Sequence, residues 1–411
     1  MIKSVFFSFG INFINLLFPL LLIPFFIKIL GLGIYGIIVI VLAIINYVGI
    51  ITDYSYAILG PIELNKLDKN SVLINIYISK VINTKFFLTL FASFFLMLSL
   101  YCYHIFENGF FCVFSIFLLF FSRSQNVFWI FIGLNKIYVY FYFYTFFKIL
   151  SIFFMLFFVK TKQDLDLVFF ILAVSDTLII VFSYLFLFIK HDFKYCFTKI
   201  NEVFCEFKIG FRQFLTFLSL CSLSNSSALI LGVMVKPEVV GIYSVAEKII
   251  MLIKNCTGVL FTALFPKVCS IGTYDLKKLN RFLNFLFKSY LQLFIAAAVF
   301  LFLFSDYIIP FFSKISTEEI KKYLICLLPV IIISAIGQPA YMSLIITEQK
   351  NKYSLIYLGA LFFNLLASFI LCFYFNVYGI IMSLFLTEIF ITSFLNYLTL
   401  NKFETNFFKN L

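Results

Sequence analysis

Long apolar runs alternate with short polar connections along the whole 411-residue chain. Several of these runs, among them Phe6–Phe26, Ile137–Val159 and Tyr353–Phe375, approach the roughly 20 residues that a helix needs to cross a bilayer core. The pattern therefore predicts an all-α integral membrane protein with about twelve membrane-spanning helices. We expect them near residues 5–29, 36–59, 81–103, 110–134, 137–159, 167–189, 209–233, 242–265, 287–308, 324–346, 353–375 and 379–400.

The polar segment 190–208 divides the predicted helices into two sets of six. We expect an N-terminal six-helix bundle over residues 1–189, a cytoplasmic linker over 190–208, and a C-terminal six-helix bundle with a short cytoplasmic tail over 209–411. A short sequence echo supports this division, since Gly-Ile-Tyr occurs at Gly33–Tyr35 and again at Gly241–Tyr243. Both copies lie near the start of the second helix of a half, and membrane transporters are often built from such repeated bundles around a central site.

Composition leaves no room for a soluble catalytic domain, because 63% of the residues are hydrophobic and only 12% are charged. The nine cysteines have no C-x-x-C spacing and there are only two histidines, so neither a disulfide framework nor a metal site is expected. A nucleotide-binding glycine loop and the common hydrolase motifs are also missing from the sequence. We expect no enzyme activity and no cofactor.

The net charge of +12 does not indicate a nucleic-acid partner. If both termini are cytoplasmic, most Lys and Arg residues fall in cytoplasmic segments, as the positive-inside rule requires. The basic balance therefore reflects membrane topology.

Ionisable residues inside the predicted spans are the candidate functional residues, because each costs about 2.5–3.5 kcal/mol at mid-bilayer. In the span 242–265, polar positions recur every three or four residues along one face, which therefore points to protein or water and not to lipid. The basic candidates are Arg123, Lys148, Arg212, Lys248 and Lys254, with Lys28 at the outer end of the first helix; the acidic candidates are Asp53, Asp176, Glu247 and Glu388.

Two interpretations of these charges remain open. The acids and bases can pair with one another to fix helix packing. Alternatively, because bases exceed acids, the cations can line a cavity that takes an anion such as a phosphate, a pyrophosphate or a carboxylated substrate. The acids are then candidates for ion coupling or for internal salt bridges. Lys28 can simply extend to the membrane interface.

Several short segments resemble the Wzx-type flippases of bacterial polysaccharide assembly, in the superfamily that also contains the MATE antiporters and the lipid II flippase. Asp53-Tyr54-Ser55-Tyr56 is similar to the family's D-x-G-F segment, although Ser55 stands where the family has Gly. Trp129 to Lys136 resembles W-x-F-Q-G-x-E-K, with Ile132 in place of Gln. Further similar segments are Leu30–Gly36, Glu63 with Lys66, Leu231–Lys248, Leu264–Lys267, Tyr378-Gly379 and Thr387-Glu388.

This resemblance implies a twelve-helix, two-bundle, MATE-like transporter with a central cavity in a bacterial inner membrane. Its substrate would be an undecaprenyl-pyrophosphate-linked oligosaccharide, for O-antigen or a related surface polysaccharide, moved from the cytoplasmic to the periplasmic leaflet. The basic candidates would hold the pyrophosphate, and a polysaccharide polymerase and a chain-length regulator are candidate partners. Because the sequence has no nucleotide-binding loop, the movement would draw on an ion gradient, the membrane potential or a substrate gradient.

Two other functions remain open. A MATE-like cation or drug antiporter would use acids in the cavity, whereas the predicted interior here is basic. A membrane polysaccharide polymerase would need a large periplasmic loop, and the longest predicted one spans only residues 305–323.

Overall fold

The computed structural model describes residues 2–67, 71–105, 109–191, 193–196, 200–272, 276–346 and 350–403. Within helices the side chains of some residues, Arg212 among them, lie outside this description. The described residues form helices joined by short turns and contain no strand. The all-α prediction is confirmed.

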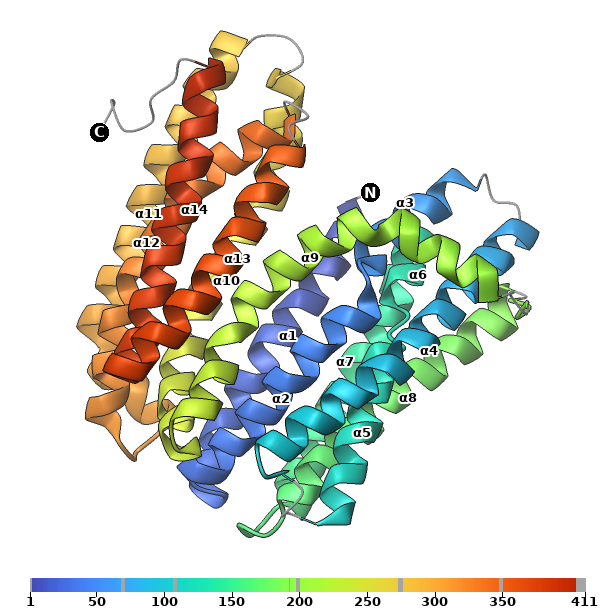
Figure 1. The fold of residues 1–411 in the computed structure, drawn as a ribbon, viewed down its shortest axis with the longest axis horizontal. Helices are drawn as coiled ribbons and strands as arrows, with labels where there is room; N and C mark the ends of the chain where they lie inside the picture. The colour runs from blue at the N-terminus through green and yellow to red at the C-terminus, as the bar shows by residue number, and fades with distance from the viewer. Residues whose placement is uncertain are drawn as a thin grey trace. The chain divides into compact units, whose positions relative to one another are not determined.

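The chain forms two compact units, residues 1–225 (unit 1) and residues 226–411 (unit 2). Within unit 1, α5 packs on α8, α7 packs on both α8 and α1, α2 packs on α4, and α3 packs on α6 (Figure 1). The helices of unit 1 are α1 (Ile2–Ile29), α2 (Leu32–Asp53), α3 (Tyr56–Lys66), α4 (Ser71–Cys102), α5 (Phe110–Ser124), α6 (Phe128–Gly133), α7 (Ile137–Phe158), α8 (Leu165–His191) and most of α9 (Ile200–Met234).

Unit 2 contains the end of α9 and five long helices. α12 packs against α10, α11 and α14, while α13 packs along α14. These helices are α10 (Pro237–Gly272), α11 (Leu276–Phe312), α12 (Thr317–Ile346), α13 (Lys350–Phe375) and α14 (Val377–Phe403). The boundary between the units, at Asn225 and Ser226, lies within α9. The sequence-based division at 190–208 stays a prediction.

Eleven of the described helices are long and apolar enough to cross a membrane, and the number rises to twelve if the bent α9 counts as one span. The two arms of α9, Gln213–Leu223 and Asn225–Met234, meet at an angle of 59°. Large aromatic side chains such as Phe94, Phe146 and Phe362 are exposed on the outer helix surfaces, where hydrocarbon and not water is the compatible solvent. The protein is a multi-pass integral membrane protein.

Two predicted helices are each broken in the structure, and this corrects the sequence-based boundaries. The predicted helix 36–59 is interrupted at Tyr54 and Ser55, which separate α2 from α3. The predicted helix 110–134 is interrupted between Ser124 and Phe128, which separates α5 from α6. Both breaks fall in short polar stretches, residues 52–55 and 122–126. Hydropathy averaged over a whole span does not resolve them, because Leu32–Lys66 and Phe110–Gly133 each remain apolar enough to pass as one span.

Several helices extend well beyond their predicted ends, for example α4, which begins at Ser71, and α11, which begins at Leu276. Hydropathy marks only the part of a helix that lies in hydrocarbon. The polar ends keep the helical backbone because it satisfies its own hydrogen bonds.

The turn between α13 and α14 depends on a glycine. Asn376 adopts a left-handed conformation with φ 51°, and α14 begins at the next residue. The chain reverses so sharply that a Cβ atom at Gly379 would lie 2.0 Å from the backbone oxygen of Leu371. Since that neighbour is backbone, it cannot rotate away.

We expect Gly379→Ala to lower stability by about 1–3 kcal/mol, because relieving the overlap must separate α13 from α14. Thermal unfolding of the purified protein in detergent measures the change. Gly258→Ala is the matched control: it lies in α10 with nothing within 4 Å of the added Cβ, so helix propensity makes it neutral or slightly stabilising. Equal melting temperatures for the two variants would contradict this account of the turn.

Candidate functional site

Two cations share one carboxylate in the interior of unit 1. Arg123 in the last turn of α5 donates from Nε to Asp176 Oδ2 on α8 at 3.1 Å. Lys148 on α7 donates from Nζ to Asp176 Oδ1 at 2.6 Å. This cluster of Arg123, Lys148 and Asp176, called the α5–α7–α8 cluster below, holds two positive charges against one negative charge.

The two cations of this cluster differ in accessibility. The Lys148 side chain is 6% exposed, and the Arg123 side chain is 30% exposed. Lys148 also lies over the rings of Phe18 and Tyr144, 4.9 and 5.5 Å from their centroids, and such faces attract a cation. Lys148 is therefore fully engaged by protein, whereas Arg123 retains an accessible edge.

Arg123 has unused hydrogen-bonding capacity. Beyond its bond to Asp176, it donates from Nη1 to Asn46 Oδ1 on α2 at 3.2 Å. A guanidinium carries five N–H donors, so within the described part of the chain three of them have no partner. A planar cation with free donors on an accessible edge suits a phosphate or carboxylate oxygen.

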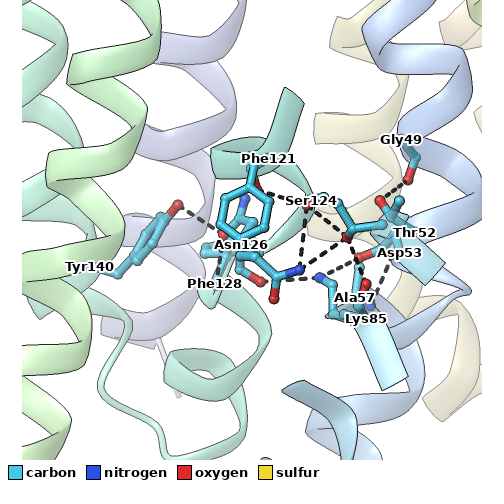
Figure 2. A network of polar contacts seen from close by, with 12 residues as sticks. Gly49, Thr52, Asp53, Ala57, Lys85, Phe121, Ser124, Asn126, Phe128 and Tyr140 are labelled. Carbon is cyan, nitrogen blue, oxygen red and sulfur yellow. Dashed lines mark hydrogen bonds and ion pairs between the residues drawn. The ribbon is translucent and has the colours of Figure 1, made fainter. Parts of the chain in front are cut away.

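A second cluster joins the two helix breaks of unit 1 (Figure 2). Lys85 on α4, only 3% exposed, donates to Asp53 Oδ1 at 3.3 Å and to the backbone oxygen of Asn126 at 3.2 Å. Asp53 ends α2, and its other oxygen accepts the backbone N–H of Ala57 in α3 at 3.2 Å. Asn126 lies between α5 and α6, and its side-chain oxygen accepts the backbone N–H of Phe128 at 2.9 Å.

Lys85 thus neutralises Asp53 and also satisfies a carbonyl that the α5–α6 break leaves without a helical partner. The sequence analysis missed this residue although it lies inside the predicted span 81–103. The available signal was a lysine near the start of the predicted span 81–103, with the acid Asp53 near the end of the preceding predicted span 36–59.

The α2–α3 break forces two consecutive residues into the left-handed region. Tyr54 has φ 45° and Ser55 has φ 66°, a conformation that costs a non-glycine residue about 1–2 kcal/mol. The Tyr54 ring stacks on Phe214 of α9 with centroids 4.6 Å apart. The Ser55 hydroxyl is buried without a hydrogen-bond partner among the described residues.

The short helices beyond the two breaks pack on each other. A Cβ atom at Gly60 in α3 would lie 2.3 Å from the Trp129 ring in α6, so the absence of a side chain at Gly60 allows the indole to lie against the helix backbone. Trp129 is also in edge contact with Tyr77 on α4, with centroids 6.1 Å apart. The Asp53 and Trp129 segments, far apart in the sequence, therefore form one structural region.

The charged residues of unit 2 have different partners from those of unit 1. Lys254 on α10 forms an ion pair with Glu388 on α14. Glu247, about two turns earlier on α10, is 6% exposed and accepts a hydrogen bond from the Tyr243 hydroxyl at 3.1 Å. Within the described residues no cation forms an ion pair with Glu247.

A set of neutral polar side chains also crosses the interior of unit 2. Ser226 on α9 donates to Asn364 on α13 at 2.9 Å, and Asn364 donates to Thr387 on α14 at 3.0 Å. One turn further along, the hydroxyls of Ser368 and Ser383 are 2.6 Å apart. These bonds hold α13 against α14 and α9 without any net charge.

The remaining basic candidates from the sequence do not form part of either charged cluster among the described side chains. Lys28 is exposed at the end of α1. Lys248 is partly exposed, and its side chain makes no ion pair or hydrogen bond within the described part of the chain. The Arg212 side chain lies outside the described residues. Among those that are described, no group of three or more His, Cys, Asp or Glu side chains is arranged to hold a metal ion.

We expect Ser55→Gly to stabilise the protein by about 1 kcal/mol, because glycine adopts φ 66° without strain and removes a buried hydroxyl that lacks a partner. Thermal unfolding in detergent tests this. Ser93→Gly in the regular helix α4 is the control, and there glycine should cost about 0.5 kcal/mol. If both substitutions destabilise equally, the left-handed strain at Ser55 does not exist in the protein.

We also expect Asp176→Asn to destabilise the fold by about 3–5 kcal/mol, since it leaves the buried Lys148 and the partly exposed Arg123 beside each other without an acid. Lys148→Met should cost less than about 2 kcal/mol, because Arg123 and Asp176 then remain as a balanced pair. Unfolding experiments on both variants give the ranking, with Asp306→Asn, which breaks the exposed pair with Lys321, as a near-neutral control. A reversed ranking would mean that Asp176 does not hold both cations.

Comparison with known proteins places these sites in a structural context. A search of curated proteins found no match. The fold is similar to that of the lipid II flippase MurJ in an inward closed conformation, with TM-score 0.72 and 18% identity over 98% of this chain and 89% of that one. It is also similar to an inward-facing MATE multidrug transporter, with TM-score 0.64 and 14% identity over 98% and 96% of the two chains.

A eukaryotic MATE transporter, AtDTX14, has TM-score 0.55 and 11% identity over 99% of this chain and 95% of that one. At these identities the likeness concerns the fold alone. The sequence itself matches the family described as "Polysaccharide biosynthesis protein" over residues 1–271, which include the α5–α7–α8 cluster and both helix breaks. The chain belongs to this polysaccharide biosynthesis protein family.

Proposed function

We propose that this protein is a flippase for lipid-linked polysaccharide repeat units. It moves an undecaprenyl-pyrophosphate-linked oligosaccharide, for O-antigen or a related surface polysaccharide, from the cytoplasmic to the periplasmic leaflet of a bacterial inner membrane. Both termini are cytoplasmic in this proposal. The family match and the flippase and transporter folds among its structural neighbours support a lipid-linked cargo.

The observation that carries the proposal is the α5–α7–α8 cluster. It retains one positive charge after pairing, and the accessible member, Arg123, keeps three N–H donors without partners in the described residues. A pyrophosphate group that leaves water loses hydration, and a preorganised guanidinium compensates that loss. Its planar donor geometry also recognises phosphate oxygens in pairs.

The other cations differ in whether they can contact the anion directly. Lys248 has no partner among the described residues and can contact the anion directly. Lys254 is held by Glu388 and Lys148 by Asp176, so these two set the local potential and hold the helices. Arg212 and Lys28 stay candidates for the cytoplasmic and outer ends of the path.

The movement would follow an alternating-access cycle, as in repeat-built transporters. The chain offers no nucleotide-binding loop, so an ion gradient or the membrane potential supplies the energy. A cationic-drug antiporter is the less favoured function, because the accessible charge of unit 1 is positive.

Arg123→Gln is the sharpest test, because it leaves Lys148 and Asp176 as a neutral pair and so preserves the fold. In a flippase-null strain we expect it to reduce surface polysaccharide at least about tenfold at equal protein levels, since hydrogen bonds to a charged group contribute about 1.5–3 kcal/mol. Arg123→Lys should restore part of the activity.

Lys321→Gln, which removes the cation of an exposed pair with Asp306, is the control and should behave as the wild type. Full complementation by Arg123→Gln would remove the proposed anion site. Export of cationic drugs without any effect on surface polysaccharide would favour an antiporter.

A further inference from the structure

One buried acid differs from the other acidic candidates in its partners. Asp53 is bonded to Lys85, Asp176 to Arg123 and Lys148, and Glu388 to Lys254. Each of these three carboxylates is therefore neutralised by a cation. Glu247 has no ion pair within the described residues, although it is only 6% exposed.

The lack of a cation at Glu247 matters because the residue lies within a membrane-spanning segment. It lies ten residues after Pro237, where α10 begins, which corresponds to about 15 Å along the helix axis. The apolar span runs from Pro237 to Phe265, so Glu247 lies inside the part of α10 that can cross the hydrocarbon core. A carboxylate without a cation is costly at such depth, so the acid is retained there in its neutral, protonated form unless the site opens to water.

The groups around Glu247 suit an acid that gains and loses a proton. The Tyr243 hydroxyl, one turn away on the same face of α10, donates to Glu247 Oε1 at 3.1 Å, and it can donate to the acid in either state. The Ser227 hydroxyl, at the end of α9, is a second hydrogen-bonding group at the carboxyl. Both neighbours are neutral and polar.

Among the described residues, neither of the two nearest cations forms an ion pair with Glu247. Lys248 and Lys254 on α10 contribute electrostatically, but Lys254 is committed to Glu388. Lys248 is the next residue along the helix and so points to a different face. α11 and α12 also pack against α10, and within the described residues they bring no charged side chain to the carboxyl.

We propose that Glu247 is a proton-binding site and that its protonation cycle couples a proton gradient to transport; the coupling part rests on the proposed flippase function. The carboxylate takes a proton from water on one side of the membrane and becomes neutral. It releases that proton to water on the other side when the site opens there, so no other reactant is required. Asp53, Asp176 and Glu388 are structural acids in this scheme and keep their charges.

Infrared difference spectroscopy of the protein in lipid tests the proton site without any substrate. The C=O stretch of a protonated carboxylic acid is distinct from the carboxylate bands. We expect the wild type to show this stretch at mildly acidic pH and to lose it reversibly as the pH is raised. Glu247→Gln should abolish the signal. Tyr243→Phe should keep the C=O stretch but shift the pH at which half of it is lost by up to about one pH unit, because the variant lacks the hydrogen bond from the Tyr243 hydroxyl.

Asp306→Asn is the control, because it removes another carboxylate of unit 2 that is exposed and paired with Lys321, and so leaves the buried pairs unchanged. It should leave the pH-dependent signal intact. A wild-type protein without the signal, a signal that survives in Glu247→Gln, or one that disappears in Asp306→Asn would each overturn the proposal. If Glu247→Gln does not fold, Glu247→Asp and Tyr243→Phe replace it. A changed pH midpoint of the C=O stretch in these variants assigns the signal to Glu247, and an unchanged midpoint in both would overturn the proposal.

Proteoliposomes that contain the lipid-linked glycan then test the coupling. We expect an imposed proton gradient to accelerate glycan movement in the wild type and in Asp306→Asn, and to have no effect in Glu247→Gln. Gradient-independent movement in the wild type would overturn the coupling while leaving the flippase function in place. The infrared signal without glycan movement would instead contradict the flippase function and leave the proton site standing.

Discussion

A charge in the hydrocarbon of a membrane must be neutralised by a partner, exposed to water, or given up by titration. The described interior of this protein shows the first of these responses in three places, at Asp176, at Asp53 and at Glu388. The Asp176 site is the most constrained, because one carboxylate serves two cations from two different helices. The packing of α5, α7 and α8 and the accessibility of Arg123 both depend on that shared acid.

The two units use their charges in different ways. In unit 1, basic side chains exceed acids at the α5–α7–α8 cluster, and the accessible excess belongs to Arg123. In unit 2, the cation Lys254 is matched by Glu388, and the acid Glu247 is left with neutral hydrogen-bonding neighbours. An anion site in one unit and a proton site in the other would allow the cargo and the driving ion to bind without competing for the same groups.

Hydropathy was sufficient to predict the number of spans and the all-α class, because the bilayer imposes one length and one secondary structure on each crossing. It did not locate the breaks at Tyr54–Ser55 and Gln125–Val127, because the few polar residues there lie within segments that stay apolar when averaged over a span. The family resemblance contained a signal for the first break that hydropathy did not provide. The family has Gly at the position of Ser55, and the left-handed backbone there, with φ 66°, gives the physical reason for that preference.

The partners of each charge also depend on tertiary structure. Stripe periodicity indicated that Lys254 and Glu247 point away from lipid, but whether an ammonium group meets a carboxylate is decided by helices distant in the sequence, as for Lys254 and Glu388 or Lys148 and Asp176. Lys85 was missed for the same reason, because its importance comes from two helix breaks that only the fold brings together.

The most direct measurement is an experimental structure of the protein bound to a lipid-linked pyrophosphate. The account predicts that a phosphate oxygen lies within hydrogen-bonding distance of the Arg123 guanidinium, while Lys148 stays bonded to Asp176. A pyrophosphate bound elsewhere, with Arg123 still engaged only by Asp176 and Asn46, would contradict it.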